Sequence, residues 1–130
     1  MLEKGMKAEM TKTVTDDDVR MFAKVSSDTN PVHLDEEYAK KSMFGRRIAH
    51  GMISAGYISA VLGNKLPGNG SIYLGQTLKF MKPVYLNDTI TTVVEIIDVN
   101  EERHIYTLKT DCINQRGEVV TTGEAKIMKK

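Results

Sequence analysis

The sequence predicts an α+β fold in which a curved antiparallel sheet wraps around one long helix. An uncharged run over residues 48–64 places apolar side chains on most sides of a helical cylinder, which is typical of a helix buried on nearly all sides. Segments with a period of two follow this run and are separated by short turns, so they are expected to pair antiparallel. Because the helix needs cover on several sides, the sheet is expected to curl around it.

Length and composition predict a single domain over residues 1–130, since 130 residues match the usual domain of roughly 100–150. Hydrophobic residues make up 41% and charged residues 27% of the chain, as in ordinary globular proteins. Eighteen Lys and Arg against 17 Asp and Glu leave a net charge of +1. This balance argues against nucleic acid and anionic membranes as partners. A small molecule or a second copy of the chain is expected instead.

Signal segments and cysteine content bear on the expected location of the protein. The first residues contain no apolar run of the kind found in signal peptides, and the run over 48–64 is too short and too polar to span a bilayer. A cytoplasmic location is therefore expected. Cys112 is the only cysteine, which excludes an intrachain disulfide and a cysteine metal cluster. We expect it at a buried strand position.

A short strand and then a helix are predicted at the start of the chain. Thr15 is expected to cap that helix, because the aspartates at 16–18 favour the positive end of a helix. Val19, Phe22 and Ala23 give this helix an apolar face.

A second short helix is predicted after Pro31. Asn30 is expected to be extended because a proline follows it. Asp35 can cap a helix that continues to Lys40, and Gly45 suits the left-handed residue that ends it.

The long helix is predicted over residues 48–64. Small residues recur every four positions along it and form a groove that a strand, a partner helix or an acyl chain could approach closely. They are Gly51, Ala55, Ser59 and Gly63. Close packing within the fold is the simplest explanation of this groove.

Four strands are predicted after the turn at 65–70. The first, over 72–80, alternates with Ile72, Leu74, Leu78 and Phe80 on one expected buried face. The others are expected over 89–99, 104–113 and 118–128. A long helix wrapped by such a sheet is the hot-dog fold.

Two places could carry chemistry. Asp28 and His33 lie five residues apart in a segment that Pro31 stiffens, so they could hold one water between them. The simpler interpretation is that Asp28 closes a turn and His33 is an ordinary surface residue. Gly51 opens the long helix after His50, and its amide could donate to a negative oxygen. Close packing would explain Gly51 equally well.

The residues resemble a known family at this point. The matching motifs are Asp28-x-Asn30-Pro31-x-His33-x-Asp35 and Arg46-x-Ile48-x-His50-Gly51-Met52, followed by Leu66-Pro67-Gly68, Ile72-Tyr73-Leu74-Gly75 and Lys82-Pro83-Val84. They resemble the signature of the MaoC-like hydratases, the hot-dog (R)-specific enoyl-CoA hydratases, over nearly the whole chain. Arg47 departs from the family, which often has proline there, and Ser27 stands where many members have glycine. Arg47 could alter the entrance of the site.

The resemblance implies (R)-specific hydration of trans-2-enoyl-CoA to (R)-3-hydroxyacyl-CoA. Asp28 and His33 would be the catalytic pair, and Gly51 would bind the thioester oxygen through its amide. Ser59 would lie beside the catalytic centre, and Asn30 belongs to the same motif as a substrate-binding candidate. Hydration needs a nucleophilic water, a proton for the α-carbon and a donor for the enolate oxygen. No metal or redox cofactor is required.

Other functions stay open. A 3-hydroxyacyl-acyl-carrier-protein dehydratase is one alternative, although such enzymes often carry a carboxylate on the central helix, which 48–64 lacks. A non-catalytic acyl-CoA sensor is another, but it would not need the pair Asp28 and His33. No ligand spacing supports a metal site among His33, His50, His104 and Asp28. The resemblance also implies a homodimer whose sheets join edge to edge, with the active site at the interface.

Overall fold

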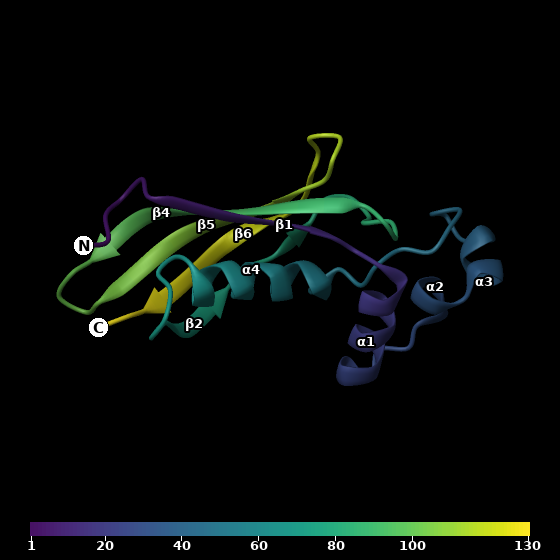
Figure 1. Ribbon diagram of the computed structural model, residues 1–130, viewed down its shortest axis with the longest axis horizontal. Coiled ribbons are helices and arrows are strands. Elements are labelled where there is room, and N and C mark those ends of the chain that lie inside the picture. The colour runs from purple at the N-terminus through teal and green to yellow at the C-terminus, as the bar shows by residue number, and fades with distance from the viewer.

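The computed structural model describes residues 1–130, which form one antiparallel sheet with helices along one face and beyond one end (Figure 1). The elements are β1 (Lys7–Thr13), α1 (Asp16–Ser26), α2 (Pro31–Leu34), α3 (Glu36–Lys40), α4 (Met52–Asn64), β2 (Ile72–Gln76), β3 (Lys79–Phe80), β4 (Thr89–Asn100), β5 (Ile105–Ile113) and β6 (Val119–Met128). The strand order is β1-β4-β5-β6-β2, and β3 also pairs with β6. All pairs are antiparallel, as predicted.

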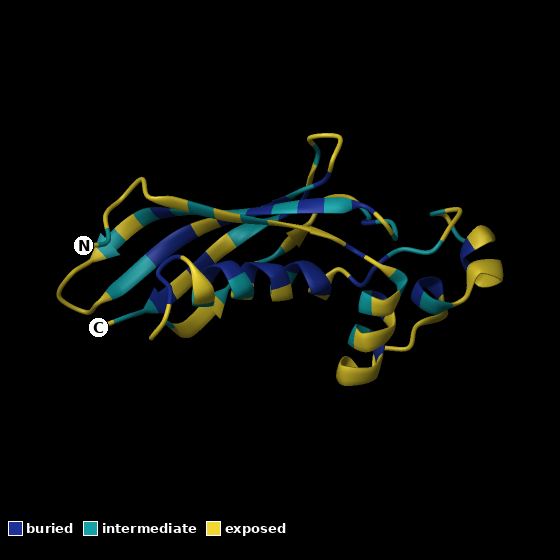
Figure 2. Ribbon diagram, viewed as in Figure 1, coloured by how far each residue is buried: buried dark blue, intermediate teal, exposed yellow.

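The hydrophobic core lies between the sheet and α4. It includes Ile58 and Leu62 from the helix and Val94, Leu108 and Ile127 from the strands, each at most 1% exposed. In Figure 2 the buried residues gather along α4 and along the strands beside it. Cys112 is also fully buried, on β5, as predicted.

The expected capping of the N-terminal helices is confirmed. The Thr15 hydroxyl accepts from the amide of Asp18, whose carboxylate accepts from the amide of Thr15, both at 3.1 Å. Asp35 accepts from the amide of Tyr38 at the start of α3. Gly45 has the expected positive φ of 76°, but α3 ends earlier, at Lys40. The helices α1, α2 and α3 lie together beyond one end of the sheet (Figure 1).

The long helix is shorter than predicted. It begins at Met52, and the chain at Ile48 and Ala49 runs beside another segment instead, because Ile48 pairs with Tyr85 and the amide of Ala49 donates to Val84 at 2.7 Å. A short apolar run cannot by itself distinguish a buried extended segment from a helix.

The prediction that this helix is buried on nearly all sides is also wrong for the single chain. Its groove of small residues stays open, since Gly51 and Ser59 are exposed and Ala55 and Gly63 are half-buried. The groove is therefore not explained by close packing within one chain.

The predicted strand over 72–80 is two short strands, β2 and β3, with an irregular segment between them. Its expected buried face is wrong, because Ile72, Leu74 and Phe80 are each about half exposed, at 55%, 48% and 51%. No burial alternation is seen in β2, where residues 72–75 are all exposed, because β2 lies at the edge of the sheet. The strands β4, β5 and β6 match their predicted bounds within one residue.

Candidate functional site

His33 lies on α2, a single helical turn that the sequence prediction treated as part of a loop. Asn30 caps this turn, accepting from the amide of Val32 at 3.3 Å, and Pro31 occupies its first position, where the missing N–H costs nothing. His33 is 8% exposed, so it is not an ordinary surface residue. Its Nδ1 contacts the carbonyl oxygen of Ile48 at 2.7 Å.

Asp28 lies in the turn between α1 and α2 and is exposed. Ser27 before it adopts the left-handed conformation, with φ 68° and ψ 11°, and ends α1. Asp28 Oδ1 accepts from the amide of Asn30 at 3.2 Å, and the amide of Asp28 donates to the Ser26 hydroxyl at 3.1 Å. The turn-closing role is thus present, and it holds the carboxylate in place.

His50 joins these two residues, a contact that its position in the sequence did not predict. It is 3% exposed, its Nε2 donates to the backbone carbonyl of Asp28 at 2.9 Å, and its ring stacks on that of His33 with centroids 3.9 Å apart. One side-chain ligand atom from each of Asp28, His33 and His50 lies within 4.8 Å of the others. The sequence signals for His50 were its position directly before Gly51 and its place in the motif Arg46-x-Ile48-x-His50-Gly51-Met52.

The hydrogen bonds fix the tautomers of both imidazoles. A carbonyl oxygen only accepts, so His33 carries its proton on Nδ1 and His50 carries its proton on Nε2. Burial lowers the pKa of His33, although the bond to Ile48 opposes this effect; His50 lowers the pKa further and Asp28 raises it. A neutral His33 therefore offers the lone pair of Nε2, which is the form that a general base requires.

Gly51 directly precedes α4, with φ −55° and ψ −35°. Its amide donates no hydrogen bond within the chain, as expected for the first donors of a helix. A side chain here would meet the ring of Phe80 at 2.9 Å. Gly51 thus both permits a close packing contact and presents a free amide.

The other two site candidates are placed differently. The Asn30 side-chain oxygen is used in capping α2, so a contact with substrate would have to come from its amide nitrogen. Ser59 lies on the exposed side of α4, eight residues after Gly51 and about 12 Å further along the axis. The single chain does not bring Ser59 to Asp28 and His33.

Arg47 packs against the turn that carries His33. Its side chain is only 11% exposed and forms an ion pair with Asp16 at 2.5 Å. Its Nε donates to the backbone carbonyl of His33 at 2.8 Å. Arg47 therefore fastens α2 to the start of α1, and proline at this position could not make these bonds.

Two imidazoles and a carboxylate form a donor set that some metals use. Here Nδ1 of His33 and Nε2 of His50 are each bonded to a backbone carbonyl. The rings stack with an interplanar angle of 29°, and the free lone pairs lie in the ring planes, so they do not converge on one point. This geometry favours a hydrogen-bonded pair over a chelate.

A groove beside the N-terminal half of α4 begins at Met52, the residue after Gly51. It has a volume of about 380 Å³ and runs between α4 and β2. Its lining includes Met52, Ala55, Leu74 and Leu78.

None of the helices is long and apolar enough to cross a membrane.

Comparison with known proteins is consistent with this geometry. The family model described as "MaoC like domain" matches residues 1–116. The chain is 46% identical to an (R)-specific enoyl-CoA hydratase of Rhodospirillum rubrum, covering 98% of this chain and 88% of the relative. It is 35% identical to a mitochondrial 3-hydroxyacyl-[acyl-carrier-protein] dehydratase of Solanum lycopersicum, covering 98% of this chain and 78% of the relative.

The same similarity extends to solved structures. The (R)-hydratase from Aeromonas caviae involved in PHA biosynthesis superposes with a TM-score of 0.97 at 43% identity, covering 99% of this chain and 98% of that one. The fold is therefore a hot-dog fold, as predicted. The chain belongs to the MaoC-like family.

Proposed function

We propose that this protein is a hydro-lyase that adds water to trans-2-enoyl-CoA and forms (R)-3-hydroxyacyl-CoA, reversibly. The observation that carries the proposal is the pair of Asp28 and His33, held by one buried histidine beside the unused amide of Gly51. Relatives named (R)-specific enoyl-CoA hydratase at 44–46% identity support it.

The Asp28–His33 pair takes a proton from the attacking water and later gives a proton to the substrate. A water that donates to the Asp28 carboxylate and to Nε2 of His33 attacks C3 of the enoyl group, and one of its protons passes to the pair. The electron pair of the double bond moves onto the thioester oxygen, where the amide of Gly51 stabilises the enolate. The proton held by the pair then passes to C2, so that one water is added in full. Because both transfers come from one face, the addition is syn, and the R product requires that the Asp28–His33 pair meets the face of C3 that gives this configuration.

The groove between α4 and β2 suits the acyl chain. Its apolar lining starts at Met52, directly after the proposed thioester contact at Gly51, and continues past Ala55 and Leu74. This chemistry uses no metal or redox cofactor. The cytoplasm is the proposed compartment, since a single buried thiol fits a reducing environment.

A homodimer is part of the proposal. The exposed apolar residues of β2, Ile72 and Leu74, lie at an unpaired sheet edge next to the open small-residue groove of α4. An edge of this kind pairs readily with another chain, and a second copy would cover both features and close the acyl groove. Light scattering that finds a fully active monomer would contradict this part.

A 3-hydroxyacyl-acyl-carrier-protein dehydratase is the second candidate, favoured by the Solanum lycopersicum relative. The site chemistry is the same in both cases, and the net charge of +1 neither attracts nor repels an acidic carrier strongly. A non-catalytic acyl-CoA sensor fits less well, because a sensor has no use for a water-binding pair.

An assay of crotonyl-CoA hydration tests the proposal. The loss of the absorbance of the enoyl thioester monitors the reaction. We expect turnover and a chirally pure (R)-3-hydroxybutyryl-CoA product. A series from four to twelve carbons, as coenzyme A and as acyl-carrier-protein thioesters, then separates the two enzymes. Binding of crotonyl-CoA without any hydration would support the sensor and overturn the enzyme assignment.

A further inference from the structure

The proposed acyl groove, between α4 and β2, runs away from Gly51 in a defined direction. The segment from β2 to β3 is antiparallel to α4. Its last residue, Phe80, lies against Gly51, because a side chain built at this glycine would meet the Phe80 ring at 2.9 Å. The turn before β2 lies at the other end of α4, where the amide of Gly68 donates to the carbonyl of Leu62 at 2.9 Å. The groove residues of this segment therefore lie progressively further from Gly51 in the order Leu78, Gln76 and Tyr73.

The far part of the groove carries two polar side chains that bind each other, the Tyr73–Gln76 pair. The Tyr73 hydroxyl donates to Oε1 of Gln76. Nε2 of Gln76 in turn donates to the carbonyl of Thr77 at 2.8 Å and to the hydroxyl of Thr110 at 2.9 Å. Thr110 is fully buried. Gln76 therefore cannot turn aside without breaking hydrogen bonds to a buried partner, which costs free energy.

The space between Gly51 and this pair is short. Of the residues of α4, only Met52 and Ala55 line the groove, and Ala55 lies about 6 Å beyond Gly51 along the helix axis. Ser59, one turn further along, does not line it. A long acyl chain must therefore displace the Tyr73–Gln76 pair or turn into water, where additional CH₂ groups bury no apolar surface.

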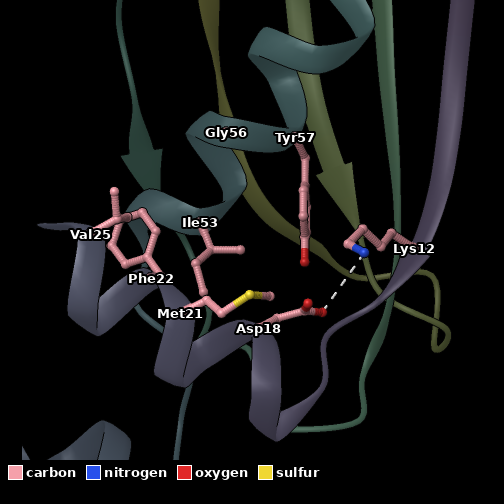
Figure 3. A pocket seen from close by; sticks show the side chains of 8 residues that line it. All are labelled: Lys12, Asp18, Met21, Phe22, Val25, Ile53, Gly56 and Tyr57. Carbon is pink, nitrogen blue, oxygen red and sulfur yellow. Dashed lines mark ion pairs between the residues drawn. The ribbon is translucent and has the colours of Figure 1, made fainter.

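A second hollow beside α4 is separate from the acyl groove. Figure 3 shows it between α1 and α4, with Ile53, Gly56 and Tyr57 as its wall on α4. It shares no residue with the groove, whose residues on α4 are Met52 and Ala55. The groove therefore does not continue into this hollow.

We propose that the Tyr73–Gln76 pair limits the acyl group to about six carbons, a length set by the single helical turn between Gly51 and the pair. The alkyl part passes Met52 and Ala55, and its methyl end meets the ring of Tyr73. The substrates are then short-chain enoyl thioesters. This inference rests on the proposed function, because it takes the acyl chain as the occupant of the groove.

Saturated acyl-CoAs test the limit by binding alone, because they have no double bond to hydrate. Isothermal titration calorimetry of the full-length protein compares butyryl-, hexanoyl-, octanoyl- and decanoyl-CoA. We expect the affinity to rise about fourfold for each CH₂ group between four and six carbons, and by less than about twofold in total beyond six.

This measurement separates the length limit from the proposed activity. A steady rise in affinity to ten carbons would overturn the limit even if the protein hydrates crotonyl-CoA. A rise that stops at six carbons, in a protein that does not hydrate crotonyl-CoA, would support the limit and overturn the enzyme assignment. Absence of binding to every acyl-CoA would overturn both.

Two variants open the far end of the groove. Tyr73→Ala and Gln76→Ala should each raise the affinity for octanoyl-CoA relative to butyryl-CoA at least about tenfold, since two more CH₂ groups become buried. Tyr38→Ala is the matched control, because Tyr38 is an exposed tyrosine of α3 outside the groove, and it should keep the wild-type ratio. An unchanged ratio in either opening variant that is folded by circular dichroism would overturn the proposal.

A third variant tests the path of the chain without changing the pair. Ala55→Leu places a larger side chain in the groove before the Tyr73–Gln76 pair, so the gain in affinity from butyryl-CoA to hexanoyl-CoA should disappear. Leucine is a good helix former, and this substitution should leave α4 intact. A retained gain would show that the chain does not pass Ala55, and it would overturn the proposal whether or not the opening variants fold.

Discussion

His50 donates a hydrogen bond from its buried Nε2 to the backbone carbonyl of Asp28, over 2.9 Å. The same ring stacks on His33, so one side chain holds both members of the proposed pair although it touches neither functional group by a hydrogen bond. The residue comes from the segment that leads into α4, and it therefore links the turn that carries Asp28 to the helix whose first amide is proposed to bind the thioester oxygen.

Two substitutions of His50 separate these contacts. His50→Gln keeps an amide donor for the Asp28 carbonyl and loses the stacked ring, whereas His50→Phe keeps the ring and leaves the carbonyl without its donor. We expect kcat for crotonyl-CoA to fall about 10- to 100-fold in His50→Phe, because small misplacements of catalytic groups are costly, and less in His50→Gln. KM should change little in either variant. Equal losses in both, matched by equal losses of stability in urea, would indicate a packing role alone.

Asp28 and His33 are predicted to act as a unit. Asp28→Asn and His33→Gln keep the shapes of the side chains and remove the acceptors, so each should lower kcat by roughly two to four decades with a smaller change in KM. The double variant should lose little more than either single one, because both groups act on one water. Steady-state kinetics on variants that are folded by circular dichroism test this. Near-wild-type kcat in either single variant would refute the assignment.

The burial of His33 predicts a specific pH dependence. In the folded protein the pKa of His33 lies below its ordinary value of 6.5. At a pH between these two pKa values the unfolded chain therefore binds the proton more readily than the folded protein does. The stability that neutral His33 contributes is therefore complete above pH 6.5 and is lost as the pH falls through this window. Urea unfolding should show a decline with acid that His33→Gln reduces.

Activity should follow the same group. The acid limb of the kcat/KM profile should lie below pH 6.5, because the neutral base persists to lower pH in the folded protein. An ¹H–¹⁵N titration of the imidazole gives the pKa directly. A measured pKa of His33 above 6.5 would contradict both expectations.

Arg47 is predicted to stabilise the turn that carries His33. Arg47→Gln removes its ion pair with Asp16 and its bond to the His33 carbonyl, and we expect a loss of about 1–3 kcal/mol in the free energy of unfolding. Arg46→Gln is the matched control, since Arg46 only lies over the exposed side of the Tyr85 ring and should cost about 0.5–1 kcal/mol.

A second readout distinguishes the specific contact from general damage. Arg47, followed by Arg20, lowers the pKa of Asp16, so the carboxyl of Asp16 should titrate at higher pH in Arg47→Gln and not in Arg46→Gln. Carbon-detected NMR of labelled aspartate measures this. An unchanged Asp16 titration would mean that the ion pair does not form in solution.

Local signals in the sequence predicted much of the fold. Period-two alternation located β4, β5 and β6, and the residue types at Thr15 and Asp35 located two helix starts. The errors came from long-range packing. Whether the apolar face of Ile72 and Leu74 is covered depends on the position of β2 at the sheet edge, and spacing along the chain carries no information on this.

The site was predicted less completely than the fold. Asp28 and His33 were proposed as a pair because they lie close in sequence and match a family motif, and the structure brings their side chains together. His50 joins them across 22 and 17 positions, through a backbone carbonyl and a ring face, and neither contact has a local signature. The bonds of Arg47 to Asp16 and to the His33 carbonyl likewise have no local signature, because they join segments that lie apart in the sequence.

Ser27 carries the last prediction, because it is a non-glycine residue with φ 68° directly before Asp28. The left-handed conformation costs an ordinary residue roughly 1–2 kcal/mol, whereas glycine adopts it freely but loses more chain entropy on folding. Ser27→Gly, which restores the residue that many family members have, should therefore raise the free energy of unfolding by about 0.5 kcal/mol. Ser26→Gly should have the opposite sign, because the Ser26 hydroxyl donates to Phe22 at 2.6 Å and accepts from the amide of Asp28. Urea unfolding measures both, and kcat should be unchanged in Ser27→Gly but lower in Ser26→Gly, since only the second releases the Asp28 turn. A destabilised Ser27→Gly would show that the left-handed serine is not strained.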